Sequence, residues 1–133
     1  MAVRFVALWS SFLLAAMASL ILADDAPPRI KPEEARMSVD KKVEVVFEVK
    51  YSKHSERRKT AILDSEKDFQ GEKNLGIAIT EKGIQDLKQK RAVDGPADDD
   101  KGKTIRVLGT VILQEEKAYI EVNEAEQLDL APQ

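Results

Sequence analysis

The sequence predicts a small all-β domain with one short helix, and three patterns favour this fold class. Several short segments alternate apolar and polar residues, which is the period of strands with one buried face. One segment instead spaces its apolar residues three apart, which is typical of a short amphipathic helix. A glycine stands in the middle of one alternating segment, and a glycine there is typical of a bulge or a bend in a barrel.

Three strands are predicted in the first half of the domain. Residues 42–51 form the clearest one, because four apolar residues share one face and charged residues occupy the other. Residues 60–65 and 75–79 predict the second and third strands, with a polar turn over 66–74 around Phe69. The inward face of the first strand consists of Val43, Val45, Phe47 and Val49.

A helix is predicted between the third and fourth strands. Ile84 and Leu87 lie three apart within the polar segment 81–91, and Thr80 is a suitable residue to cap the first turn. A loop rich in Gly, Pro and Asp follows over 94–103. The chain is therefore expected to leave the helix through a polar connection and return as a strand.

The last part of the chain predicts two more strands. Residues 104–113 alternate around Gly109, residues 114–117 turn the chain, and residues 118–122 form the fifth strand. The order is therefore β-β-β-α-β-β. The residues expected to face the core here are Ile105, Val107, Val111 and Leu113, and Leu128 and Leu130 are expected to close the domain.

The beginning of the chain predicts export. Arg4 precedes eighteen uncharged and mostly apolar residues, and Ala23 stands before two aspartates, so residues 1–23 have the parts of a signal peptide. An uncleaved anchor is the alternative, because about 17 to 25 apolar residues can span a bilayer. Residues 24–38 hold three of the five prolines and predict a linker, which leaves 39–133 as the domain. We expect a periplasmic or secreted protein.

The composition restricts the classes of function. A chain of 133 residues with 34% charged and 43% hydrophobic residues is typical of one small globular domain. The absence of cysteine excludes disulfides, thiol nucleophiles and zinc fingers of cysteine type. A net charge of −3 also argues against a general binder of polyanions, although it leaves room for a local basic patch.

The predicted order, with Gly109 inside a strand and a single helix before it, is the plan of an OB-fold, a five-stranded Greek-key barrel. Residues 102–111 (GKTIRVLGTV) and 118–122 (AYIEV) resemble the fourth and fifth strands of small exported bacterial OB-fold proteins. Residues 62–69 and 75–79 resemble their second and third strands. The resemblance implies this fold for most of the domain.

The resemblance also implies where such a domain binds. OB-folds bind oligonucleotides, oligosaccharides or proteins through the loops after strands one and four and through the exposed face of strands two and three. In this chain those regions are 51–59, 114–117 and 60–80. They are expected to form the binding surface.

The densest basic cluster lies in the first of these regions. Its cations can bind phosphate, sulfate or carboxylate groups, and its tyrosine offers a face for stacking. A merely solubilising loop is the alternative interpretation. The candidate ligand-binding residues are Lys50, Tyr51, Lys53, Arg57, Arg58 and Lys59.

The function predicted from these observations is a non-catalytic binding module of the cell envelope, with a protein or an anionic polymer as partner. Binding of single-stranded nucleic acid is the alternative, and the main argument against it is the scarcity of aromatic residues outside the core: Tyr51, Phe69 and Tyr119. We expect no catalytic residue, cofactor or metal. His54 has no spaced partner, and the pair Asp64 and Asp68 is expected on an exposed turn.

Overall fold

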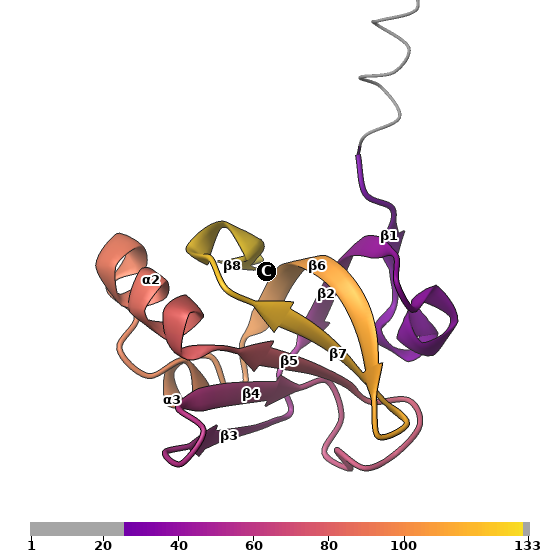
Figure 1. Ribbon diagram of the computed structural model, residues 1–133, viewed down its shortest axis with the longest axis horizontal. Coiled ribbons are helices and arrows are strands. Elements are labelled where there is room, and N and C mark those ends of the chain that lie inside the picture. Colours follow the sequence, from indigo (N-terminus) through magenta and orange to yellow (C-terminus); the bar gives the residue numbers. More distant parts are fainter. Residues whose placement is uncertain (1–25, 132–133) are drawn as a thin grey trace, which may run out of the picture.

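The computed structural model describes residues 26–131, and the predicted signal segment lies outside them. Within these residues a curved sheet encloses the core, and two α-helices gather near one end of it (Figure 1). The elements are β1 (Arg29–Ile30), the 3-10 helix η1 (Pro32–Ser38), β2 (Lys42–Glu48), β3 (Tyr51–Ser55), β4 (Thr60–Asp64), β5 (Leu75–Ile79), α2 (Glu81–Arg91), α3 (Pro96–Asp99), β6 (Thr104–Gln114), β7 (Lys117–Val122), the 3-10 helix η2 (Ala125–Gln127) and β8 (Leu128–Leu130).

The strand pairing is that of an OB-fold barrel. The hydrogen-bonded path runs β2-β6-β7-β5-β4-β3, with β5 and β7 parallel and the other pairs on this path antiparallel. Both ends of the path belong to one stretch of chain, because only Val49 and Lys50 separate β2 from β3. The Val49 amide donates to Lys103 O (2.9 Å) and the Lys50 amide donates to Asp64 O (3.0 Å). The chain changes partners at this point, and no ladder joins β2 to β3, so the sheet stays open between these two strands.

The first predicted strand therefore needs a correction. It ends at Glu48 instead of residue 51, and the region 51–59, expected as a loop, is strand β3 as far as Ser55. Residues of β3 are polar on both faces, so the alternation of apolar residues could not reveal it. Its inward-facing Ser52 donates a hydrogen bond to Ala97 O of α3, which replaces apolar packing at this position.

The core agrees with most of the predicted inward positions. Val43, Val45, Phe47 and Val49 are buried, and so are Ile105, Val107, Val111 and Leu128. Gly109 continues the same inward face, where a Cβ would lie 2.5 Å from Ile120 Cγ2, so the two strands approach too closely for a side chain. Two predictions were wrong: Leu113 is 49% exposed and Leu130 is 57% exposed. Leu113 is the second residue before the turn of the β6–β7 hairpin and is opposite Ala118.

The predicted helix is confirmed at both ends. The Thr80 hydroxyl accepts a hydrogen bond from the Gly83 amide (3.2 Å), as an N-cap residue does. The helix ends at Ala92, which has a left-handed φ of 56°. Leu87 is buried against the barrel. The following loop contains the short helix α3, which the Gly, Pro and Asp composition did not predict; its Pro96 and Ala97 are buried beside β3.

The segment before β2 is part of the folded domain, although its prolines predicted a linker. β1 pairs in parallel with β2, with Arg29 opposite Glu44 and Ile30 opposite Val45. The helix η1 follows with Pro32 in its first turn and buries Ala35 completely. Proline is favourable there because its missing N–H would have no partner in the first turn. Among the described residues, the first strand therefore begins at residue 29, ten residues before the predicted start of the domain.

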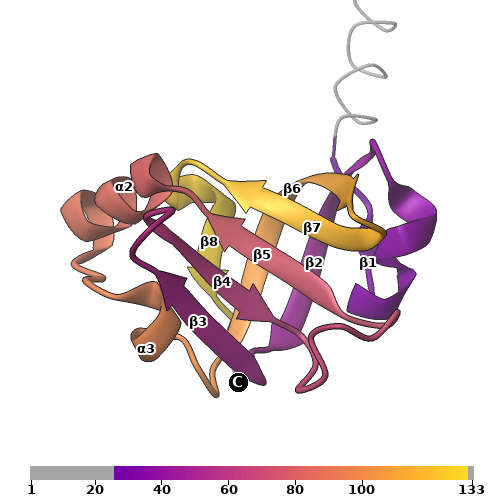
Figure 2. The same ribbon diagram turned by 60° about the horizontal axis from the view of Figure 1, so that its bottom comes forward.

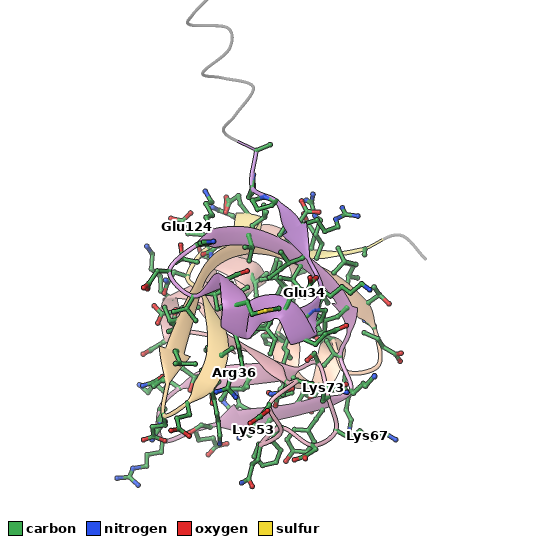
Figure 3. The ribbon with its side chains drawn as sticks, turned by 90° about the vertical axis from the view of Figure 1, so that its right-hand side faces the viewer. Glu34, Arg36, Lys53, Lys67, Lys73 and Glu124 are labelled. Atoms are coloured by element: carbon green, nitrogen blue, oxygen red, sulfur yellow. The ribbon has the colours of Figure 1, made fainter. Side chains whose placement is uncertain are left out.

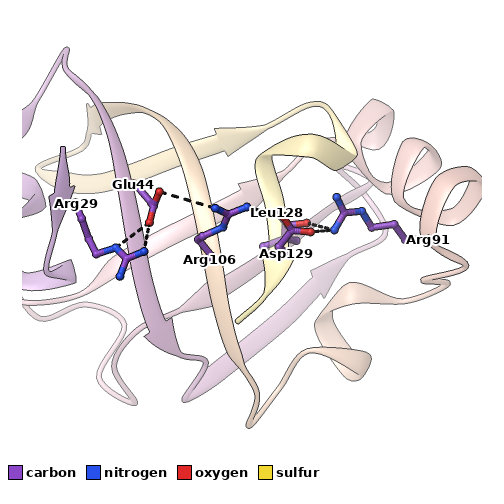
Figure 4. A network of polar contacts seen from close by, with 6 residues as sticks. All are labelled: Arg29, Glu44, Arg91, Arg106, Leu128 and Asp129. Atoms are coloured by element: carbon purple, nitrogen blue, oxygen red, sulfur yellow. Dashed lines mark hydrogen bonds and ion pairs between the residues drawn. The ribbon is translucent and has the colours of Figure 1, made fainter. Parts of the chain in front are cut away.

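A chain of charged side chains crosses the outer surface of β1, β2, β6 and β8 (Figure 4). The Arg29 Nε donates to Glu44 Oε1 (2.8 Å), and Arg106 lies 4.0 Å from Glu44 and 2.8 Å from Asp129. Asp129 also pairs with Arg91 of α2. Exposed pairs of this kind each contribute little to the free energy of unfolding. As a network they join the first and last described strands to the barrel.

The β6–β7 hairpin turn allows a prediction about stability. Glu115 and Glu116 form a two-residue turn with φ of 52° and 66°, a geometry that favours Asn-Gly and strains glutamate. Glu115→Asn combined with Glu116→Gly is expected to raise the free energy of unfolding by about 1 kcal/mol. Urea denaturation measures this change. The control, Glu115→Gln with Glu116→Gln, removes the charges but keeps the strain; an equal gain in the control would assign the effect to charge.

Candidate functional site

The outer face of the barrel carries one row of side chains in register across four strands. Tyr51 on β3 is opposite Asp64 on β4, Asp64 is opposite Gly76 on β5, and Gly76 is opposite Tyr119 on β7. Leu63, the neighbour of Asp64, faces the core, so the alternation turns the row outward. Figure 2 shows β3, β4, β5 and β7 lying side by side in this sheet.

Phe69 folds onto this row from the β4–β5 loop. Its ring stacks on Tyr51 with the ring centroids 5.0 Å apart and the planes inclined by 15°. The Lys53 ammonium lies 4.3 Å from the Phe69 centroid and the Lys117 ammonium lies 5.9 Å from it. Both distances are within the range of a cation–π interaction. We call the set Tyr51, Lys53, Phe69, Lys117 and Tyr119 the aromatic face.

Asn74 holds the loop that carries Phe69. This side chain is buried, and its Nδ2 donates both to Asp64 Oδ1 (2.9 Å) and to Phe69 O (3.2 Å). Its Oδ1 accepts a hydrogen bond from the Glu66 amide (3.0 Å). Three hydrogen bonds from one amide group therefore fix the loop against β4. The Phe69 ring is positioned by the fold and does not depend on a flexible loop alone.

Asp64 lies beneath the aromatic face, although it was expected on an exposed turn. Its residue is 2% exposed, and its Oδ2 has no hydrogen-bond partner within residues 26–131. Burial raises the pKa of this carboxyl, while the Asn74 hydrogen bond and the charges of Lys53 and Lys117 act in the opposite direction. The earlier expectation was wrong because Asp64 ends a strand whose outer side is covered by aromatic rings.

The Tyr119 ring lies over Gly76. A Cβ on Gly76 would be 2.7 Å from two ring carbons of Tyr119, so the missing side chain leaves the space that the ring fills. Burial raises the pKa of the Tyr119 hydroxyl, and the charges of Asp64 and Glu115 add to this rise. The charge of Arg58 acts in the opposite direction and lowers the same pKa.

The structure places the six predicted site residues in three different surroundings. Tyr51 and Lys53 belong to the aromatic face, whereas Lys50 forms an ion pair with Glu66 (3.2 Å). The others lie in the exposed turn after β3, roughly 13 Å along the strand from Tyr51. Of these, Lys59 also pairs with Glu81 at the start of α2 (3.7 Å). The residues in the turn are Arg57, Arg58 and Lys59.

Two contributors were missed by the sequence analysis. Asn74 carried no signal beyond its place just before a strand, where a side-chain amide can hydrogen-bond a loop. Lys117 was included in the turn 114–117 but was not a candidate residue. Figure 3 shows Lys67 and Lys73, both from the β4–β5 loop, on the same side of the molecule as Lys53. These lysines add positive charge near the loop that holds Phe69.

Two hollows of the described chain lie away from the aromatic face. A groove of about 610 Å³ runs beside β6 and η2, and its rim carries Glu121, Glu124 and Glu126. A smaller one of about 300 Å³ lies between α2 and β8, next to Arg91 and Leu128. The glutamates of the first groove would repel an anionic ligand. The aromatic face is an open surface, which suits stacking better than enclosure.

The described residues also bear on a membrane span and on a metal site. Among residues 26–131, no helix is long and apolar enough to cross a membrane. Over that range, too, no three side chains of the His, Asp or Glu type gather as they would around a metal ion. The acidic run Asp98–Asp100 consists of two exposed aspartates and the buried Asp100, whose pKa is raised by burial.

Comparison with known proteins identifies the fold. No protein-family model and no curated protein sequence matches the chain. Among solved structures, asparaginyl-tRNA synthetase from Pyrococcus horikoshii matches with a TM-score of 0.52 and 16% identity over 76% of this chain. Aspartyl tRNA synthetase from Entamoeba histolytica matches with a TM-score of 0.50 and 12% identity over 84% of this chain. What they share with this chain is the fold.

The matches cover only a small part of each synthetase. The chain corresponds to 22% of the first synthetase and 24% of the second, so most of each enzyme has no counterpart here. At such low identity the likeness concerns the path of the backbone and not the side chains. It agrees with the OB-fold deduced from the strand pairing.

Proposed function

We propose that this chain is a non-catalytic OB-fold module that binds single-stranded nucleic acid on its aromatic face. The observation that carries the proposal is the stacked pair of Tyr51 and Phe69 with the Lys53 and Lys117 ammonium groups near the Phe69 ring. Proteins that bind single strands combine aromatic rings, on which bases stack, with cations that follow the phosphates. Here an aromatic ring lies 5.0 Å from the Phe69 centroid, and two ammonium groups lie 4.3 Å and 5.9 Å from it.

This proposal favours the alternative over the function first predicted from the sequence. Basic residues alone would suit an acidic glycan or an acidic protein as well as a nucleic acid. Two stacked aromatic rings lie on the face that OB-folds use for oligonucleotides. Such rings favour a ligand with flat groups, and nucleic acids have them in their bases. The names of the two matching structures refer to tRNA, which gives the proposal further support.

The net negative charge of the chain does not oppose the proposal. Binding depends on the local potential, and two cations lie beside the aromatic rings: Lys53 and Lys117. Glu115 and Glu116 at the hairpin turn oppose them. We therefore expect moderate affinity with a steep dependence on salt rather than tight binding.

Export remains part of the proposal and rests on the sequence of residues 1–23. If these residues direct secretion, the ligand is nucleic acid outside the cytoplasm. Expression of the full chain with a C-terminal tag, followed by fractionation of the cells, tests this. Tagged chain that stays in the cytoplasm at full length would contradict export without affecting the binding proposal.

The binding proposal is tested by fluorescence anisotropy with a labelled single-stranded DNA dodecamer over a salt series. The double variant Lys53→Gln with Lys117→Gln is expected to bind more weakly at low salt. The slope of log affinity against log salt should fall by about 1.4, because each lost phosphate contact to a single strand contributes roughly 0.7. Failure of the unaltered chain to bind the dodecamer at low salt would overturn the proposal.

A matched control separates this effect from a general loss of charge. Lys82 on α2 and Lys101 after α3 are exposed lysines outside the aromatic face, so Lys82→Gln with Lys101→Gln removes the same charge. Its salt slope should stay close to that of the unaltered chain. Heparin is a second probe: if heparin binds and the dodecamer does not, the ligand is an acidic glycan.

A further inference from the structure

We propose that Asp64 determines base preference by accepting a hydrogen bond from the exocyclic amino group of a base that enters the space over Gly76. This inference rests on the proposed function and adds the chemical class of the ligand. It predicts a preference for bases that carry such an amino group, with cytosine against thymine as the clearest comparison. An aspartate or glutamate that accepts from N4 of cytosine is a known mode of base recognition.

The first step of the argument is the state of the carboxylate oxygens. Asp64 Oδ1 accepts a hydrogen bond from Asn74 Nδ2 (2.9 Å), whereas Oδ2 has no partner in the described chain. The residue is 2% exposed, so solvent does not compensate for the missing bond. A buried acceptor without a partner destabilises a fold, and each such group calls for an explanation. An amino group of a ligand supplies the missing donor.

The second step is the space beside this carboxylate. Gly76 is in register with Asp64 and has no side chain, and a Cβ placed there would lie 3.3 Å from Asp64 Oδ1. The same point lies 2.7 Å from the Tyr119 ring, so a flat ring already fits directly above the glycine. The Tyr119 ring fills this space. A base that displaces the Tyr119 ring would bring its edge to the Asp64 carboxylate.

The third step is the path of the nucleic acid. Tyr51 lies on the other side of Asp64 from Tyr119, because the strands run in the order β3, β4, β5 and β7. The Phe69 ring stacks on Tyr51. A neighbouring base can therefore stack on the Tyr51–Phe69 pair while the first base occupies the space over Gly76. Lys53 and Lys117 are within reach of the phosphates that join them. Asp64 is then the one group in the row that reads a base edge.

The test compares two oligonucleotides that differ in the amino group. Anisotropy titrations with dodecamers of dC and of dT at low salt should give about tenfold tighter binding of dC to the unaltered chain. In the Asp64→Asn variant, the side-chain oxygen keeps accepting the hydrogen bond from Asn74. The amide nitrogen therefore takes the place of Oδ2. A donor then faces the base, and the preference for dC should disappear or reverse. Asp68→Asn, an exposed acid of the neighbouring loop, should keep the preference.

A second measurement needs no variant. In the unaltered chain, the ¹³C resonance of the Asp64 carboxyl should shift on addition of the dC dodecamer and stay in place with the dT dodecamer. Equal binding of both dodecamers, with no difference in the carboxyl shift, would overturn the role of Asp64 and leave the proposed function standing. Binding of neither dodecamer would overturn both.

Discussion

Phe69→Ala is expected to weaken binding of the single-stranded dodecamer at least tenfold. Removing an aromatic platform costs about 1–3 kcal/mol for each base that stacks on it. Phe69 also organises its surroundings, because its ring holds Tyr51 in a stack and attracts the ammonium groups of Lys53 and Lys117. Its loss therefore removes a stacking surface and loosens two cations at once.

The fold should tolerate this change. Phe69 is half-buried on a loop, and the hydrogen bonds of Asn74 reach its backbone rather than its ring. Anisotropy gives the affinity, and urea denaturation of the same samples confirms that the domain remains folded. Phe69→Leu is the matched control for apolar volume and should lose nearly as much affinity, since a leucine has no π-face. If Phe69→Ala binds as tightly as the unaltered chain, the stacked pair is not the binding platform.

Gly83→Ala is expected to lower the free energy of unfolding by about 3 kcal/mol, the size of a severe overpacking defect. Intrinsic helix propensity predicts the opposite sign, because alanine is favoured over glycine inside a helix by about 1 kcal/mol. The tertiary contact decides the outcome. A Cβ at Gly83 would lie 2.3 Å from the Val122 carbonyl oxygen and 3.1 Å from Ile79 Cγ2. The helix would have to move away from the ends of β5 and β7.

Urea or thermal denaturation of the single variant measures this loss. Gly95→Ala is the control, because the nearest atom to its added Cβ is Asp98 Oδ2 at 4.0 Å. That variant should stay within about 0.5 kcal/mol of the unaltered chain, as exposed substitutions usually do. A Gly83→Ala variant that is as stable as the control, or more so, would show that α2 packs less tightly on the barrel than the structure indicates.

Elements that depend on residues close together in the sequence could be predicted from it. The helix Glu81–Arg91 agrees with the prediction at both boundaries, because Thr80 supplies an N-cap and the apolar spacing ends with the helix. β5 and the buried face of β2 agree as well, since their apolar alternation is regular. The fold class followed from the order of such elements and from Gly109.

What the sequence could not show depends on contacts between distant segments. β3 is polar on both faces, and its partner β4 and the helix α3 make it a strand. Asp64 has the composition of an exposed turn, and its burial results from rings contributed by three separate elements. Of the six candidate residues, only two belong to the aromatic face: Tyr51 and Lys53. Phe69 and Lys117 joined them from segments that no local pattern connects.

The parallel pairing of β5 with β7 has a consequence for how this protein becomes active. Leu75 pairs with Ala118, so a loop of about 40 residues must close before these strands meet. Contacts of such long range form slowly, in contrast to local hairpins such as β3–β4. Tyr51 and Lys53 lie on the early hairpin, whereas Lys117 and Tyr119 lie on β7. Binding competence should therefore require closure of this long loop, because the two halves of the aromatic face meet only then.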